Sequence, residues 1–141
     1  MVRKHDIDPM LAKIPLFSAC SARHLAEITR NTVTSSYPAG TVIARQGEIG
    51  REFLVIVEGN ASVVLDGETI ATLGPGDFFG EIALLDGGPR TATVTAETDL
   101  VVEVMSHAEF TAFLVEVPEL TRSILKGVAA RLRVTDARLV H

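Results

Sequence analysis

An acid, Glu81, and a base, Arg90, stand out in the stretch FFGEIALLDGGPRTATV, residues 78–94, whose other residues are apolar, small or turn-forming. An arginine guanidinium presents a planar fork of donors that suits phosphate oxygens. An ionised carboxylate only accepts hydrogen bonds, so Glu81 suits a hydroxyl donor and not the phosphate itself. A nucleotide ribose-phosphate carries both an anion and a nearby hydroxyl. The two residues together therefore predict a nucleotide site.

The residues between the two charges favour the same ligand. Gly80 removes a side chain where the backbone needs to approach another group closely. Residues 81–85, EIALL, are expected to form about one helical turn, whose first amide groups attract an anion. Residues 86–89, DGGP, then return the chain so that Arg90 emerges beside that turn. The alternative is that Glu81 and Arg90 only pair with each other at the surface, which contributes little.

Bulk properties indicate one domain over residues 1–141. The net charge is −5, a poor match to a protein that coats nucleic acid, so no direct nucleic-acid binding is expected. No apolar run approaches the roughly 20 residues of a membrane span, and the N-terminus lacks an apolar signal core, so a cytoplasmic protein with no membrane partner is expected. Cys20 is the only cysteine, which excludes an internal disulfide and a cysteine metal cluster.

Helices are expected at both ends of the chain, over residues 1–30 and 106–141. The first segment contains a short piece that stops before Pro15 and a second piece with Ser21 as N-cap. Ser106, with Glu109 three residues later, forms the sequence pattern of a capping box. A long helix then begins at Pro118 and carries one apolar stripe.

Short β-branched runs separated by glycines fill the region between the helices. Residues 53–73, FLVIVEGNASVVLDGETIATL, predict three strands joined by two tight turns, the second at Asp66-Gly67. Residues 90–105 predict two more strands. The sequence thus predicts an α+β fold: an antiparallel, jelly-roll-like β-roll over residues 33–105, short N-terminal helices and a long C-terminal helix.

Residues 79–94, FGEIALLDGGPRTATV, resemble the phosphate-binding cassette of the cyclic nucleotide-binding domain family, which includes catabolite activator protein, cyclic-nucleotide-dependent kinases and gated channels. Residues 37–65 and 73–85 are similar to that family's β-roll. The resemblance implies that Glu81 accepts the ribose 2′-hydroxyl and that Arg90 binds the cyclic phosphate. The remaining cassette contacts that it implies are those of Gly80 and the backbone amides of Ile82 and Ala83.

The resemblance does not decide which base the nucleotide carries. Thr91 stands where a hydroxyl in this family is linked to tolerance of cGMP. Residues 129–139, AARLRVTDARL, are similar to a helix of catabolite activator protein. There, a threonine at the position of Thr135 contacts the adenine amino group, and an arginine at the position of Arg131 reaches towards the ribose and the cassette carboxylate. Asp136 departs from that pattern, which has a serine there, and weakens the expectation of a base contact across a dimer.

Two strand residues, Val63 and Ile70, either face the base or belong to the core. Thr91 and Thr135 have structural alternatives as well: the first as a residue entering a strand, the second as part of the apolar helix stripe. The basic stretch 118–141 is typical of a solvated helix face.

The sequence therefore predicts a non-enzymatic sensor whose ligand is cAMP, with cGMP as the alternative, and which uses no cofactor. The last helix is expected to act as a lid and to offer a homodimer surface, and the output is expected to go to a protein effector. One alternative is a small metalloenzyme on a cupin-like roll, which the positions of His5, His24, His107 and His141 outside the strands disfavour. Another is a roll without ligand used for protein interaction, which the presence of both cassette charges disfavours.

Overall fold

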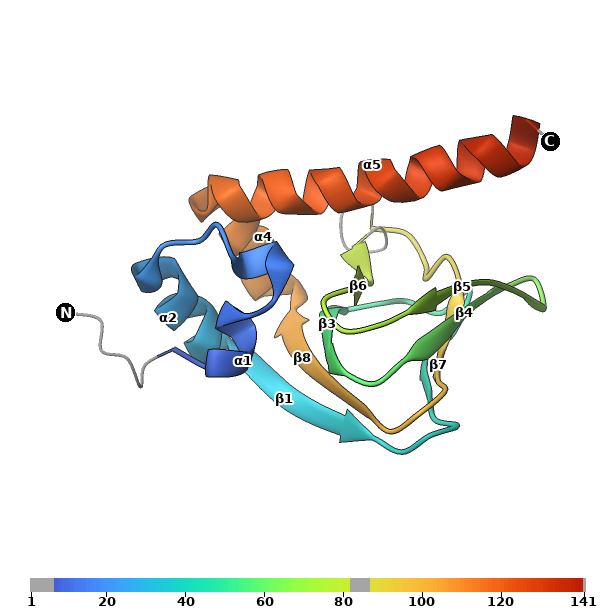
Figure 1. Ribbon diagram of the computed structural model, residues 1–141, viewed down its shortest axis with the longest axis horizontal. Coiled ribbons are helices and arrows are strands. Elements are labelled where there is room, and N and C mark those ends of the chain that lie inside the picture. Colours follow the sequence, from blue (N-terminus) through green and yellow to red (C-terminus); the bar gives the residue numbers. More distant parts are fainter. Residues whose placement is uncertain (1–6, 82–86, 141) are drawn as a thin grey trace.

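The computed structural model describes residues 7–81 and 87–140, and side chains as far as residue 131. Helical segments come before and after the strands in the order of the sequence (Figure 1). The N-terminal ones are α1 (Pro9–Ala12), η2 (Pro15–Phe17) and α2 (Ala22–Asn31), and the C-terminal ones are α4 (His107–Glu116) and α5 (Pro118–Val140). The strands between them are β1 (Thr32–Tyr37), β2 (Val42–Ala44), β3 (Glu52–Glu58), β4 (Ala61–Leu65), β5 (Glu68–Leu73), β6 (Phe78–Phe79), β7 (Thr93–Ala96) and β8 (Leu100–Ser106).

The strands form two antiparallel sheets, in the orders β1-β8-β3-β6 and β2-β7-β4-β5. This arrangement confirms the predicted α+β roll with helices before and after it. Strands β3, β4 and β5 follow one another as the sequence predicts. The turn between β4 and β5 has positive φ at both Asp66 (51°) and Gly67 (81°), as a tight hairpin turn requires.

Side-chain caps start two of the helices where the sequence predicts them. The Ser21 hydroxyl accepts a hydrogen bond from the amide of His24 (3.2 Å), and the Ser106 hydroxyl accepts one from the amide of Glu109 (3.3 Å). The prediction before Ser21 was incomplete, because a short 3-10 helix begins at Pro15. Proline fits there because the first residues of a helix need no amide donor.

Strand β3 of the sheet β1-β8-β3-β6 is buried on both faces, to which its neighbouring side chains point in turn. On β3, Leu54 and Ile56 pack inside the roll, whereas Phe53 and Val55 pack against the helices. The Phe53 ring stacks on Phe110 of α4 with centroids 4.6 Å apart. The helices are therefore fixed to the roll through an apolar core of their own.

Helix α5 runs along the whole domain and crosses the roll above β6 (Figure 1). Gly127 makes this close approach possible, because a Cβ there would lie 2.7 Å from the ring of Phe78. Phe78 also packs edge-to-face on Phe53, with centroids 5.6 Å apart. Strand β6 and α5 are thus in direct contact next to Gly80. In the described part of the chain, no helix is both long and apolar enough to cross a membrane.

Candidate functional site

Glu81 follows β6 and Gly80 and is almost completely buried, with 2% of its surface exposed. Its Oε1 lies 2.6 Å from Nη1 of Arg131 on α5. A buried carboxylate is costly unless a charged or hydrogen-bonding partner compensates it. Arg131 supplies that compensation, so α5 and the end of β6 hold each other in place.

Arg131 makes further contacts to the same strand. Its Nη2 donates to the main-chain oxygen of Phe78, and its guanidinium carbon lies 4.5 Å from the centroid of the Phe78 ring. A guanidinium over an aromatic face is attracted by the quadrupole of the ring, whose face is partially negative. The arginine is therefore fixed by an ion pair, a backbone acceptor and an aromatic face at once.

The main chain at Arg90 is held by the loop before β3. The Arg90 amide donates to the oxygen of Glu48 (2.7 Å), and its own oxygen accepts from the amide of Gly47 (2.9 Å). A bridge between Ile49 and Pro89 extends this pairing. The backbone position from which the Arg90 side chain extends is thus fixed by contacts with a distant part of the sequence.

The guanidinium of Arg90 is only partly satisfied. Its Nη2 donates to the main-chain oxygen of Glu52 (3.1 Å), whereas its buried Nη1 has no hydrogen-bond partner within residues 7–81 and 87–140. Burial lowers the pKa of Arg90, and the negative charges of Glu52 and Glu81 oppose that shift. A buried charged donor without an acceptor is expensive, and an anion placed beside it would relieve that cost.

Two glycines make room for this guanidinium. A Cβ on Gly80, whose φ is 94°, would collide with Nη1 of Arg90 and would lie 2.6 Å from the oxygen of Glu52. A Cβ on Gly50 would collide with Nε of Arg90. The sequence predicted the need for Gly80 but not for Gly50, because no local pattern connects Gly50 with a side chain forty positions away.

The alternative that Glu81 and Arg90 pair with each other is wrong. No ion pair joins them in the described part of the chain: the carboxylate pairs with Arg131 and the guanidinium binds Glu52. Glu81 is also buried, so it does not belong to a surface pair. The two charges lie near each other and yet have different partners.

The remaining predicted site residues are distributed as follows. Thr91 is exposed in the bend before β7, Val63 on β4 is half-buried and packs against the roll core, and Ile70 on β5 is half-buried. Ile82 and Ala83 lie outside the described residues, as does most of the turn expected over residues 81–85. Thr135 belongs to α5, but its side chain is not among those described.

The fold and the site together define a class of protein: a β-roll with a partly unsatisfied arginine beside a buried carboxylate, covered by a C-terminal helix. The chain belongs to the cyclic nucleotide-binding domain family, whose model matches residues 34–116.

Several relatives are similar over most of this chain. A cyclic nucleotide-gated potassium channel of Rhizobium etli is 37% identical over 122 residues, which cover 86% of this chain and 34% of the channel. A cAMP-dependent protein kinase regulatory subunit of Mycosarcoma maydis is 40% identical over 121 residues, or 79% of this chain and 23% of the subunit. This chain therefore spans about a third or less of the length of these relatives.

A solved structure agrees with the fold. The catabolite activator protein of Thermus thermophilus is 28% identical and superposes with a TM-score of 0.79 over 89% of this chain and 61% of that one. The predicted resemblance to this family is confirmed.

Proposed function

We propose that this chain binds cAMP and acts as a regulatory sensor module, without catalysis and without a cofactor. The buried Nη1 of Arg90 carries the proposal, because a cyclic phosphate would supply the acceptor that this donor lacks. Glu81 would accept a hydrogen bond from the ribose 2′-hydroxyl. Gly80 and the backbone amides of Ile82 and Ala83 would complete the contacts to the phosphate.

Helix α5 would be the element that responds. Arg131 binds Glu81, the carboxylate that the ribose would also use, so ligand and helix have one acceptor in common. A signal requires that the nucleotide bind one position of α5 better than another. Sharing an acceptor supplies such a difference, since the strength of the Arg131 contact changes when a hydroxyl approaches Glu81.

The choice of cAMP is supported by relatives that carry it in their names, among them the kinase regulatory subunits. Thr135 on α5 would contact the base, with Val63 and Ile70 beneath it on the roll. cGMP is the competing ligand, and the exposed position of Thr91 directly after Arg90 favours it.

The proposed module extends over residues 1–141 and works in the cytoplasm. It would pass its signal to a protein effector and not to nucleic acid. We place a homodimer contact on the outer face of α5, where Leu125 leaves 63% of its surface exposed. An apolar side chain at that level of exposure suits a helix seam between two copies.

Calorimetric titration with cAMP and cGMP tests the ligand. Losing one charge-assisted contact to the phosphate in Arg90→Ala should weaken cAMP binding by about 10- to 150-fold. Arg23→Ala, which removes an exposed arginine on α2, outside the site, is the matched control and should bind as the wild type does. Absence of heat with either nucleotide at several temperatures would leave the roll as an interaction domain without this ligand.

A further inference from the structure

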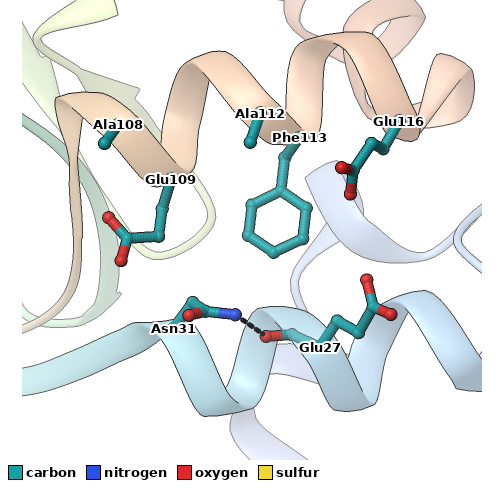
Figure 2. A pocket seen from close by; sticks show the side chains of 7 residues that line it. All are labelled: Glu27, Asn31, Ala108, Glu109, Ala112, Phe113 and Glu116. Carbon is teal, nitrogen blue, oxygen red and sulfur yellow. Dashed lines mark hydrogen bonds between the residues drawn. The ribbon is translucent and has the colours of Figure 1, made fainter.

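A groove of about 310 Å³ lies between α2 and α4, on helices that contribute no residue to the site above. Figure 2 shows the ring of Phe113 pointing from α4 into the space between the two helices. Ala108 and Ala112 lie along the same side of α4 and leave that space open. Phe113 itself is 3% exposed and belongs to the helix core, so the accessible apolar floor of the groove is formed mainly by the two alanines.

The rim of the groove is acidic. Glu109 stands on one side of the Phe113 ring, and Glu27 and Glu116 stand on the other side (Figure 2). Within residues 7–81 and 87–131, none of these three carboxylates forms an ion pair. Asn31 adds an amide, whose nitrogen donates to the main-chain oxygen of Glu27 at 2.8 Å. Like charges around one groove repel one another, and a cation placed among them would be attracted by all three.

The spacing of the carboxylates selects the kind of cation. No cluster of three or more acidic, histidine or cysteine side chains among the described residues could hold a metal ion. A larger, organic cation reaches carboxylates on both sides of the groove. Arginine combines such a head, whose planar fork of donors suits more than one carboxylate, with an aliphatic stem that packs on apolar surface.

We propose that the groove between α2 and α4 docks an arginine-bearing segment of a partner protein. The stem of the arginine packs on Ala108 and Ala112, and the guanidinium lies between the carboxylates of the rim. Helix α4 is joined to α5 through Val117 and packs against it. A partner in the groove therefore contacts the helix on which α5, with Arg131, is packed. Docking itself needs no nucleotide, so it stands whether or not cAMP binds the roll.

The test uses the short peptide acetyl-Ala-Arg-Leu-Arg-Ala-amide and follows the backbone amide signals of the protein by NMR. A peptide with citrulline in place of both arginines keeps the shape and removes the charge. We expect the arginine peptide to shift signals of α2 and α4 in a saturable way, and the citrulline peptide to shift them much less. Equal effects of the two peptides, or shifts confined to other parts of the chain, would overturn the proposal.

Variants separate the groove from the general negative charge of the chain. Glu27→Gln with Glu116→Gln should weaken the peptide by about 3- to 30-fold. Glu58→Gln with Glu68→Gln removes the same charge from exposed positions on the roll and should change the affinity much less. An equal loss in both double variants would show attraction by net charge alone and would overturn the proposal.

Ala112→Leu fills the groove without changing its charge, and leucine is a good helix former. We expect this variant to lose the peptide while its thermal unfolding stays close to that of the wild type. Unchanged peptide binding would contradict docking in the groove. The wild type could instead associate with itself, and the double variant Glu27→Gln with Glu116→Gln and the variant Ala112→Leu could both abolish that association. This result would make a second copy the occupant and would overturn the assignment to a partner protein.

Discussion

Arg131 and Glu81, fifty residues apart in the sequence, form an ion pair of 2.6 Å between the long C-terminal helix and the end of β6. The carboxylate is buried, whereas the arginine side chain keeps 39% of its surface exposed. The pair is therefore asymmetric: loss of the arginine leaves a buried charge without this partner, whereas loss of the carboxylate leaves a cation that water can reach.

Removing Arg131 should loosen α5. The variant Arg131→Ala is expected to lose about 1–3 kcal/mol of unfolding free energy, because Glu81 stays buried without its cation. Urea unfolding measures the loss, and hydrogen exchange should show faster exchange of α5 amides. Arg122→Ala, at an exposed position on the same helix, is the control and should stay within about 0.5 kcal/mol of the wild type. Equal stability of the two variants would contradict a structural role for the pair.

The role of Glu81 can be separated from that of Arg90 by changing the ligand. If Glu81 accepts the ribose hydroxyl, the wild type should bind 2′-deoxy-cAMP about 10-fold or more weakly than cAMP. Glu81→Leu, which removes the acceptor and keeps a similar size, should bind both nucleotides with similar affinity, whereas Arg90→Ala should keep the difference between them. Calorimetric titration of the three proteins with cAMP and 2′-deoxy-cAMP measures these affinities. A Glu81→Leu variant that still discriminates would place the ribose hydroxyl on another group.

Gly50→Ala should impair nucleotide binding without touching the ligand. Its added methyl group would collide with the Arg90 side chain and displace the guanidinium. We expect a loss of cAMP affinity of about 10-fold, since a small displacement weakens a phosphate contact strongly. Gly74→Ala is the control, because the nearest atom to its Cβ is the side-chain oxygen of Asn60 at 3.2 Å, which can move away. Equal affinities in both variants would contradict the packing argument.

Glu103 on β8 should make stability depend on pH. It is 4% exposed, and burial raises the pKa of its carboxyl above the usual value, with Asp8 adding to the shift. The hydroxyl of Thr34 donates to it at 2.7 Å and opposes that shift. The folded state therefore holds the proton of Glu103 more tightly than the unfolded chain does. The stability that this protonation contributes is complete below the pKa of the unfolded chain and is lost as the pH rises through the folded pKa.

Urea unfolding at a series of pH values tests this. Glu103→Gln keeps the shape and stays neutral, so its stability should fall less than that of the wild type as the pH rises from acid to neutral. Glu97→Gln, at an exposed position, should follow the wild type. Parallel curves for wild type and Glu103→Gln would show that the carboxyl does not carry the effect.

The parts of the fold that could be predicted are those with local causes. Asp66-Gly67 predicted its hairpin because positive φ at both residues is a property of the turn itself. Ser21 and Ser106 predicted helix starts because each cap involves an amide three residues later. The predicted roll followed from the regular spacing of such turns.

The parts that could not be predicted depend on distant contacts. Gly50 matters because Arg90 passes over it, which no pattern around Gly50 shows. Glu103 is an acid in an apolar strand, and the pKa of its carboxyl depends on Asp8 and Thr34, which are far away in the sequence. The contact of Arg131 with Glu81 was indicated only by resemblance to a family, because spacing alone does not bring the two together.

The glycine in the middle of α5 has a mechanical consequence. At Gly127 the helix rests directly on the ring of Phe78, and four residues later, one helical turn on, Arg131 binds the backbone of the same phenylalanine. An interior glycine costs a helix roughly 0.5–1 kcal/mol relative to alanine. The close contact between α5 and Phe78 is therefore gained at the expense of the local stability of the helix. Phe78 is therefore the point about which α5 would turn: a tilt of the helix on that ring would move the Arg131 guanidinium relative to the Glu81 carboxylate, so a small rotation would be enough to break their ion pair.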